Sequence, residues 1–478
     1  MDADLRPSRR EFLRTGAALG GLAMAPPLLA QEPWPIKPNP ANPLAPRLPM
    51  FAPKAKSVIF VLIHGGLSQM DSFDPKPELD RHHGKKLTGE LLPGVQVMTY
   101  NGGNAAPLLR SPFKFRKHGQ SGIEVSELFP GIADHVDELC FVRSIYGDFN
   151  NHCPALYQLN TGMGPQGYPS MGAWITYALG SDNSDLPGFI VMTECNAFPI
   201  GGPSNWGSGF LPAAYQGTMV RTGGTPILDL KPPADLAGED QRASLDLLGR
   251  LNRDHLKERR GDTELEARMA SYELAFRMQA KTPEVVDLSR EPEETRKLYG
   301  LDVKETEDLG SKCLLARRLV ERGVRFVQVY SGAYQCGTDW DAHGDVAGNH
   351  RDRARRADRP IAALLKDLKR TGLLSQTLVV FASEFGRMPI SQGSNGRDHN
   401  PGVQTIWLAG PGVKGGTVIG ASDPVGFKAA EEPHHVRDLH ATMLHLLGLD
   451  DMRLTYYFNG RHQRLTENGG QLIRKALA

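Results

Sequence analysis

Three short polar clusters in the last third of the chain carry the residue types that bind divalent metal ions. They are residues 339–343 (DWDAH), 383–387 (SEFGR) and 397–400 (RDHN). Each cluster follows or precedes an apolar run with the composition of a β-strand. Carboxylates and imidazoles together suit ions such as Zn, Mn or Fe, and a metal held beside an anionic ester polarises that ester. One such cluster alone would be a weak signal, whereas three in order predict a metal site.

The first cluster supplies Asp341 and His343 as predicted metal ligands. In an extended backbone these two side chains point the same way, whereas on a helical turn Asp339 and His343 do. The spacing leaves both arrangements open. In a purely structural alternative, the acids cap the following helix and His343 bonds locally.

The second and third clusters supply two further candidate ligands and two cations. Glu384 is a predicted metal ligand, and Arg387 could offer its planar guanidinium to a phosphate or sulfate oxygen. An ion pair between these two residues is the structural alternative. His399 is the strongest single candidate ligand, because Pro401 favours an extended backbone that presents the ring outward. Arg397 is the second cation that could neutralise charge on the anion.

Candidate site residues also occur upstream. His64 begins a His-Gly-Gly sequence after the first apolar run, and Asp71 follows shortly afterwards; either could complete the metal shell. His152 is predicted to act as a ligand or as a general acid. The adjacent Cys153 is a weaker candidate nucleophile, because lone cysteines are more often inert.

Short apolar runs, several of them rich in β-branched residues, alternate along the chain with helical patterns. This order predicts a doubly wound α/β fold, with a mostly parallel sheet and helices on both faces. Ligands of such sheets bind beyond the carboxyl ends of the strands, where His64, Glu384 and residues 339–343 are expected to lie. The predicted strands are residues 57–63, 139–145, 188–192, 324–330, 377–382 and 405–408, and predicted helices include 311–322 and 359–374.

The composition of the chain also predicts its organisation. Residues 1–30 combine the sequence SRREFLR (8–14) with a small-residue apolar stretch, as twin-arginine signal peptides do; a basic tail is the alternative. The proline-rich residues 31–53 are predicted to form a linker or wrapping arm. Residues 54–478 are predicted to form one domain with a helical insertion near 237–280. The expected location is therefore the periplasm or the cell envelope.

Charge and cysteine content exclude several classes of protein. The chain has 55 basic and 54 acidic side chains and a net charge of +1, so no basic field for nucleic acid is expected. After residue 30 no run resembles a transmembrane helix. The cysteines are odd in number and far apart, which does not indicate a disulfide framework; they are Cys140, Cys153, Cys195, Cys313 and Cys336.

Longer motifs extend these clusters into a family pattern. They are residues 64–77 (HGGLSQMDSFDPKP), 151–155 (NHCPA), 340–343 (WDAH), 383–387 (SEFGR), 396–400 (GRDHN) and 438–448 (DLHATMLHLLG). Together they resemble the bacterial domain-of-unknown-function 1501 family, a branch of the alkaline phosphatase and sulfatase superfamily, from about residue 57 to the C-terminus. The resemblance implies a doubly wound sheet with metal at the strand ends. It also implies hydrolysis of phosphate or sulfate esters through a Ser, Thr or modified Cys nucleophile.

The chain departs from the superfamily pattern at three points. No Ser or Thr stands in an obvious nucleophile position after the predicted strand 139–145. The sulfatase signature Cys-x-Pro-Ser-Arg is absent around Cys153, and Glu384-Phe385 stands where the phosphatases carry an Asp-His pair. The leading expectation is an exported hydrolase that uses a divalent metal such as Zn, Mn or Ca. Its substrate would be a small anionic ester or a sulfated or phosphorylated glycan. The alternative is a catalytically degenerate member that binds anionic glycans or cell-envelope partners without turnover.

Overall fold

The computed structural model of the protein describes most of the chain beyond residue 41, and all described residues belong to one compact unit, 37–478. The predicted signal peptide and the first part of the predicted linker lie outside the described residues. No helix in the described part of the chain is long and apolar enough to cross a membrane. The described residues are 42–86, 106–222, 227, 239–258, 263–393 and 395–478.

A nine-stranded sheet forms the centre of the described residues, in the order β12-β4-β11-β8-β1-β7-β5-β6, with β15 beside β4. Its middle strand is β1 (Ser57–Ile63), whose seven residues are all buried. β1 pairs in parallel with β7 (Phe326–Ser331) and with β8 (Thr377–Ser383). The other strands are β4 (Cys140–Tyr146), β5 (Phe189–Met192), β6 (Thr218–Met219), β11 (Gln404–Ala409), β12 (Thr417–Ile419) and β15 (His434–His435).

One strand of this sheet runs against the others. β11 is antiparallel to both of its neighbours, β8 and β4, so that these two are parallel to each other. The remaining pairings in the sheet are parallel. The predicted fold class, a mostly parallel sheet in an α/β fold, is therefore confirmed, and all six predicted strands occur within two residues of their expected bounds.

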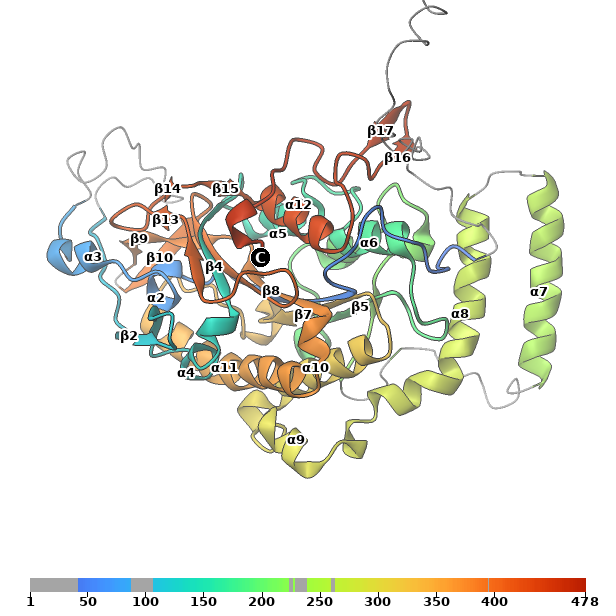
Figure 1. Ribbon diagram of the computed structural model, residues 1–478, viewed down its shortest axis with the longest axis horizontal. Helices are drawn as coiled ribbons and strands as arrows, with labels where there is room; N and C mark the ends of the chain where they lie inside the picture. The colour runs from blue at the N-terminus through green and yellow to red at the C-terminus, as the bar shows by residue number, and fades with distance from the viewer. Residues whose placement is uncertain (1–41, 87–105, 223–226, 228–238, 259–262, 394) are drawn as a thin grey trace, which may run out of the picture. The chain divides into compact units, whose positions relative to one another are not determined.

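Helices cover both faces of the sheet (Figure 1). On one face, α10 (Lys304–Glu321) and α11 (Val346–Arg370) pack together against the strands. A single apolar cluster joins Ile59 of β1 to Leu315 of α10 and Ile361 of α11. Because this cluster removes large apolar side chains from water, it is the main stabilising part of the fold.

The opposite face is covered by three helices that come from distant parts of the chain. These are α5 (His152–Thr161), α6 (Met171–Leu179) and α12 (Val436–Leu446). Phe60 of β1 faces them, beside Met443 of α12. The sheet is thus buried on both sides, as its continuous apolar strands predict.

The region of the predicted helical insertion contains α7 (Glu239–Glu258) and α8 (Thr263–Val286), which pack against each other. An ion pair of 2.8 Å joins Arg242 of α7 to Glu273 of α8.

Shorter elements complete the described fold. The short helices are α2 (Gln69–Ser72), α3 (Pro77–His82), α4 (Pro130–Ala133) and α9 (Glu293–Leu298). Four strand pairs lie outside the main sheet: β2 (Phe115–His118) with β3 (Ile123–Ser126), β9 (Gly386–Gln392) with β10 (Gly396–Asn400), β13 (Ala421–Ser422) with β14 (Ala429–Glu431), and β16 (Tyr456–Phe458) with β17 (Arg461–Gln463).

Residues 42–53, the described part of the predicted arm, lie along the domain. The guanidinium of Arg47 donates to the carbonyls of Thr176, Tyr177 and Ala178 at the end of α6. A cation is favourable there, because the last carbonyls of a helix carry partial negative charge and have no partner within the helix.

One disulfide bond, between Cys195 and Cys336, forms although the cysteine spacing did not suggest one. The two residues are 141 positions apart in the chain. They meet because β5 and β7 are neighbours in the sheet and each cysteine follows one of these strands. Sequence spacing cannot show such a pairing. Among the described residues, Cys140, Cys153 and Cys313 are free thiols.

Candidate metal centre

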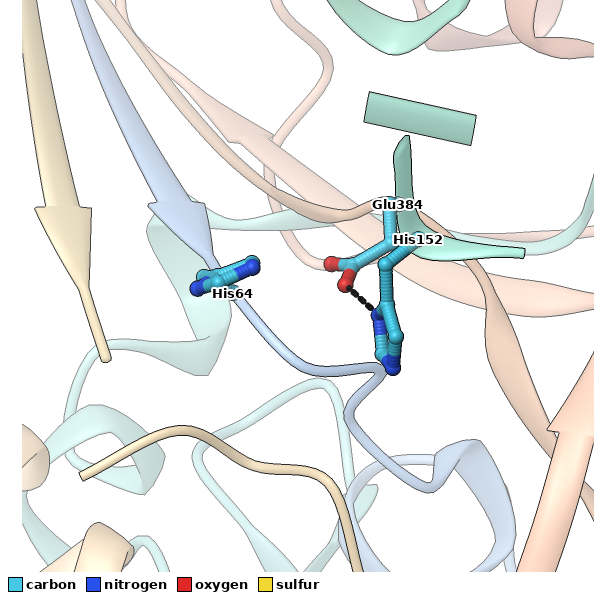
Figure 2. Close-up of side chains that lie close together, drawn as sticks. All are labelled: His64, His152 and Glu384. Carbon is cyan, nitrogen blue, oxygen red and sulfur yellow. Dashed lines mark hydrogen bonds and ion pairs between the residues drawn. The ribbon is translucent and has the colours of Figure 1, made fainter. Parts of the chain in front are cut away.

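Three candidate ligands meet at the carboxyl ends of the central strands (Figure 2). His64 follows β1 directly, Glu384 follows β8 directly, and His152 is the first residue of α5. The side chain of Asn151 caps α5 by accepting a hydrogen bond from the amide of Cys153, which fixes where the helix begins. One ligand atom from each of His64, His152 and Glu384 lies within 4.8 Å of the others, so this group could hold a metal ion.

A second group shares His152 with the first. It consists of His152, Asp341 and His399, again with ligand atoms within 4.8 Å of one another. Asp341 lies between three rings: its Oδ1 is 2.8 Å from His343 Nε2 and 3.1 Å from His399 Nε2, and its Oδ2 is 3.3 Å from His152 Nε2.

Residues 339–343 of the loop after β7 form no helical turn, and this decides between the two arrangements that the sequence left open. Asp341 and His343 point to the same place. Asp339 instead accepts a hydrogen bond of 3.0 Å from the amide of Asp341 and caps the turn.

His64 has two buried ring nitrogens, Nδ1 and Nε2, without hydrogen-bond partners. The Nε2 atom of His152, in contrast, lies 3.3 Å from Asp341 Oδ2. Burial lowers the pKa of His64, although the charge of Glu384 opposes this effect, so the ring is held neutral. An unsatisfied buried polar atom costs free energy, whereas a neutral imidazole with a free lone pair is the commonest protein ligand for metals. The residues therefore fit a metal ion.

The rings of His343 and His399 have the arrangement that metal-binding histidines adopt. His399 Nδ1 donates to the carbonyl of Asn150 at 2.8 Å, and His343 Nδ1 hydrogen-bonds to Gln392 Oε1. These outer contacts leave both Nε2 atoms facing inward, 2.9 Å apart. Two lone pairs cannot approach so closely without a cation between them, which can be a proton or a metal ion.

The charges around these rings show where a cation is favoured. A hydrogen bond to Asp341 raises the pKa of His343, whereas burial lowers the pKa of His399. Burial would raise the pKa of Asp341, but hydrogen bonds from His152, His343 and His399 hold it far below its usual range. Asp341 therefore remains an ionised carboxylate, which is the form that binds metal.

Glu384 and His152 form a buried pair with opposite charges. Burial would lower the pKa of His152, but hydrogen bonds to Asp341 and Glu384 raise it to about 9. Burial would likewise raise the pKa of Glu384, but the bonded His152 ring lowers it to about 2. The distance between His152 Nδ1 and Glu384 Oε1 is 2.7 Å, and Glu384 Oε1 also accepts from the amide of Gly65 at 2.8 Å.

Arg387 lies beside Asp341 but is fully engaged by the protein. Its guanidinium donates to Asp341 Oδ1 at 2.5 Å, and to the carbonyls of Gly65, Gly66 and Arg397. The side chain is completely buried. Arg387 thus positions Asp341 and keeps it charged. The structural alternative predicted from the sequence was an ion pair with Glu384, but Arg387 pairs with Asp341.

Asp71 and Arg397, predicted as a ligand and an anion-binding cation, lie outside both candidate metal groups. They form a two-pronged ion pair, with distances of 2.7 and 3.2 Å, and both side chains are completely buried. Ser68 donates a further hydrogen bond of 2.5 Å to Asp71. The geometry indicates a structural role for both residues instead. The guanidinium of Arg397 donates to both carboxylate oxygens of Asp71, so neither group is free for a metal or an anion.

The outer contacts of the site were not predictable from the sequence. Gln392 ends β9 and fixes His343, and the carbonyl of Asn150 fixes His399. A backbone carbonyl leaves no trace in the residue type, and a glutamine at the end of a strand is common. No sequence signal could have found either of them.

The comparisons with known proteins place the chain in a family. Residues 55–477 match the model of the family described as "Protein of unknown function (DUF1501)". The chain therefore belongs to this family, as its motifs predicted. No curated protein sequence matches the chain.

Solved structures with a similar course of the chain include three proteins that are named for different activities. The phosphonate monoester hydrolase from Silicibacter pomeroyi has 12% identity and a TM-score of 0.38, covering 88% of this chain and 76% of that one. The PsFucS1 sulfatase from Pseudoalteromonas sp. has 13% identity and a TM-score of 0.34, with coverage of 86% and 75%. The lipoteichoic acid synthase LtaP from Listeria monocytogenes has 10% identity and a TM-score of 0.38, with coverage of 84% and 74%. Such low sequence identities and TM-scores support no conclusion about the activity of this chain, so the chemistry must be inferred from the site itself.

Proposed function

We propose that this protein is an exported hydrolase of phosphate or sulfate esters that depends on a divalent metal ion. One observation carries the proposal. The Nε2 atoms of His343 and His399 face each other 2.9 Å apart, both beside one oxygen of Asp341, while the Nδ1 atom of each ring is already bonded elsewhere. This is a preformed place for a cation with imidazole and carboxylate ligands.

Asp341, His343 and His399 would hold the ion. Two imidazoles and one carboxylate favour Zn or Mn over Ca, which prefers oxygen ligands throughout. When bound, such an ion polarises the ester and lowers the pKa of a water molecule. Arg387 keeps Asp341 ionised and oriented, since its guanidinium lies 2.5 Å from Oδ1.

His152 would deliver a proton to the departing oxygen of the ester. Glu384 accepts the hydrogen bond from His152 Nδ1 and so orients the ring, which leaves Nε2 directed toward Asp341. A carboxylate that orients a histidine in this way also stabilises its protonated form. His64, packed near His152 with a ring-centre distance of 6.0 Å, closes the site on the side of β1.

Two series of substrates test these roles, one of aryl phosphates and one of aryl sulfates. Within each series the leaving phenols differ in pKa. The wild-type protein, loaded with Zn²⁺ or Mn²⁺, is expected to hydrolyse at least one series and to contain bound metal by elemental analysis. The variant His399→Ala is expected to lose both metal and turnover. His152→Gln is expected to retain metal. Its hydrolysis rate should fall most for esters whose leaving phenol has a high pKa, because such a leaving group needs a proton, and least for nitrophenyl esters, whose leaving group has a low pKa. The exposed His462→Ala serves as the matched control.

The same experiment addresses the alternative of a binding protein without turnover. The complete engagement of Arg387 favours that alternative, because no free guanidinium from this residue reaches an anion. Bound metal without hydrolysis of any ester in the two series would overturn the proposed hydrolase.

Export is tested separately by fusing residues 1–53 to a reporter that is active only outside the cytoplasm, with Arg9→Lys/Arg10→Lys as the control for the twin-arginine sequence.

A further inference from the structure

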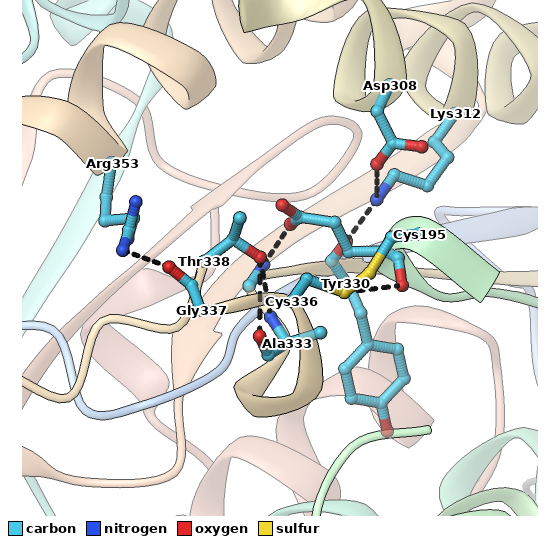
Figure 3. The surroundings of a disulfide bond; sticks show 11 residues. Cys195, Asp308, Lys312, Tyr330, Ala333, Cys336, Gly337, Thr338 and Arg353 are labelled. Carbon is cyan, nitrogen blue, oxygen red and sulfur yellow. Dashed lines mark hydrogen bonds and ion pairs between the residues drawn. A yellow bond between two sulfur atoms is a disulfide. The ribbon is translucent and has the colours of Figure 1, made fainter. Parts of the chain in front are cut away.

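The Cys195–Cys336 disulfide joins the two loops that follow the neighbouring strands β5 and β7 (Figure 3). Cys195 lies in a short 3-10 turn (Glu194–Asn196), and Cys336 in another (Tyr334–Cys336). Cys195 is exposed and Cys336 is partly exposed, so the bond is open to reductants in solution. The loop that contains Cys336 continues directly to Asp341.

Polar contacts reinforce the disulfide at the start of this loop. A carboxylate oxygen of Glu194 accepts a hydrogen bond from the amide of Gly332, and its carbonyl lies 3.9 Å from Cys336 Sγ. Within the loop, the amide of Ala333 donates to Thr338 Oγ1 at 3.2 Å. Glu194 therefore adds polar contacts between the two loops beside the disulfide.

The far end of the loop lies directly on the candidate metal centre. The amide of Trp340 donates to the carbonyl of His64 at 2.9 Å, and Arg353 of α11 donates to the carbonyl of Asp339 at 3.0 Å. A Cβ atom at Gly332 would lie only 2.8 Å from the carbonyl oxygen of His64. Because the loop touches the end of β1 at Gly332 and at Trp340, we expect a shift of residues 333–339 to reach Asp341.

The backbone at Cys195 has an unusual conformation for a residue other than glycine. Its φ is +43°, in the left-handed region that few residues other than glycine adopt. Once the sulfur is free, this residue can return to an ordinary backbone conformation, and its partner loop loses its covalent support.

We propose that the Cys195–Cys336 disulfide, together with Glu194, positions the loop that presents Asp341, so that the metal site is fully formed only in the oxidised protein. The effect on metal affinity rests on the proposed function, whereas the effect on the loop does not. The disulfide acts through Asp341 and touches neither metal nor substrate. In a reducing compartment the site would be loosened.

The redox step involves two electrons. A phosphine such as tris(2-carboxyethyl)phosphine attacks one sulfur, the S–S bond breaks, and water then releases the second thiol. The phosphine becomes its oxide by taking the oxygen of water, and the two hydrogens of that water end on the sulfur atoms of Cys195 and Cys336.

Amide hydrogen exchange of the full chain, in metal-free buffer, tests the positioning. In the double variant Cys195→Ser/Cys336→Ser, exchange in residues 332–343 is expected to rise at least tenfold, while that in α10 and in α11 beyond its first turn stays within twofold. Treating the wild type with the phosphine should reproduce the rise, and the double variant should not respond to the phosphine. Unchanged exchange in residues 332–343, in a variant that still gives wild-type exchange in α10, overturns the proposal.

Titration with Mn²⁺ alone gives the second readout. The dissociation constant of the double variant is expected to be at least tenfold weaker than that of the wild type, and Glu194→Gln is expected to weaken it less. A purely stabilising disulfide would change the melting temperature but leave the Mn²⁺ affinity of the folded protein within twofold, which would contradict the proposal. If the wild type bound Mn²⁺ but hydrolysed no ester, only the proposed function would fail. If it bound no Mn²⁺, the exchange experiment would still decide about the loop.

Discussion

The backbone amide of Trp340 donates a hydrogen bond to the carbonyl of His64, with 2.9 Å between nitrogen and oxygen. This bond connects the loop after β7 to the residue that directly follows β1. His64 and Asp341 belong to different candidate metal groups and to distant parts of the chain. The bond links these two parts of the chain directly, so the two groups are expected to respond together to changes at this junction.

Gly65 is the residue that makes this junction possible. A Cβ atom there would lie 2.4 Å from the amide nitrogen of Trp340 and 2.7 Å from that of Asp341, and φ is +115°. Gly65→Ala is therefore expected to displace the loop, to weaken Mn²⁺ binding at least tenfold and to lower the melting temperature. The control is Gly84→Ala, also at a positive φ of +78° but with no atom within 4 Å of the added Cβ. Calorimetry and Mn²⁺ titration of both variants check this, and equal metal affinity in the two would contradict the close approach at Gly65.

Gln392 is expected to matter for metal affinity although it would not touch the metal. Its Oε1 holds His343 Nδ1, and removal of such an outer contact typically lowers affinity by about 10–100-fold. Gln392→Ala should therefore bind Zn²⁺ about 10–100-fold more weakly than the wild type, with a circular dichroism spectrum like that of the wild type. Competition with a chromophoric chelator measures this effect. Gln120→Ala, at an exposed glutamine in the turn between β2 and β3, should bind as the wild type does; a comparable loss in both variants would count against the role of Gln392.

The buried ion pair between Asp71 and Arg397 is expected to serve stability alone. Asp71→Asn leaves a buried guanidinium without its counter-charge, which costs about 3–5 kcal/mol of unfolding free energy. The metal content should stay at the wild-type level under conditions where the variant is folded. Urea unfolding and elemental analysis measure the two quantities. For comparison, Asp254→Asn breaks the exposed pair with Lys257 and should change the unfolding free energy far less than Asp71→Asn does, because solvent screens exposed pairs. Loss of metal from folded Asp71→Asn would restore Asp71 as a ligand.

The strands were predictable because each is a continuous apolar run, and burial on both faces of a sheet requires such runs. The strand ends then follow, and with them the positions of His64, Glu384 and the loop of Asp341. The partners of these residues could not be predicted, because polar contacts depend on how loops fold back over the sheet. Asp71 lies in a motif as rich in acids as the others, yet it points to Arg397. Only the three-dimensional structure distinguishes a buried ion pair from a metal ligand.

His440 of α12 is expected to make the protein sensitive to acid. Burial lowers its pKa to about 4, and Nε2 donates to the carbonyl of Leu159 at 2.7 Å. Arg437 and His435 lower the pKa further, while Asp438 raises it. In the unfolded chain the ring takes up a proton near pH 6.5, so its contribution to stability is present above that pH and is lost as the pH falls toward about 4. The loss amounts to about 3 kcal/mol for this group.

The variant that tests this acid sensitivity is His440→Gln, whose side-chain amide can still donate to the carbonyl of Leu159. Between pH 6.5 and 4.5 the unfolding free energy of the variant, measured in urea, should fall less steeply than that of the wild type. The difference in slope should approach 1.4 kcal/mol per pH unit. His462→Gln, at an exposed histidine of β17, should keep the slope of the wild type. Equal slopes in His440→Gln and the wild type would mean that His440 is not the group responsible.

The central position of β1 has a consequence for the order in which the protein can fold during synthesis. β1 leaves the ribosome early, but both of its sheet partners, β7 and β8, are made only in the last third of the chain. The amides of Lys54 and Ala55, just before β1, bond to the carbonyl of Leu446 in α12. The nascent chain must therefore keep this fully buried strand unpaired until β7 and β8 have been made, and pairing between such distant segments is intrinsically slow.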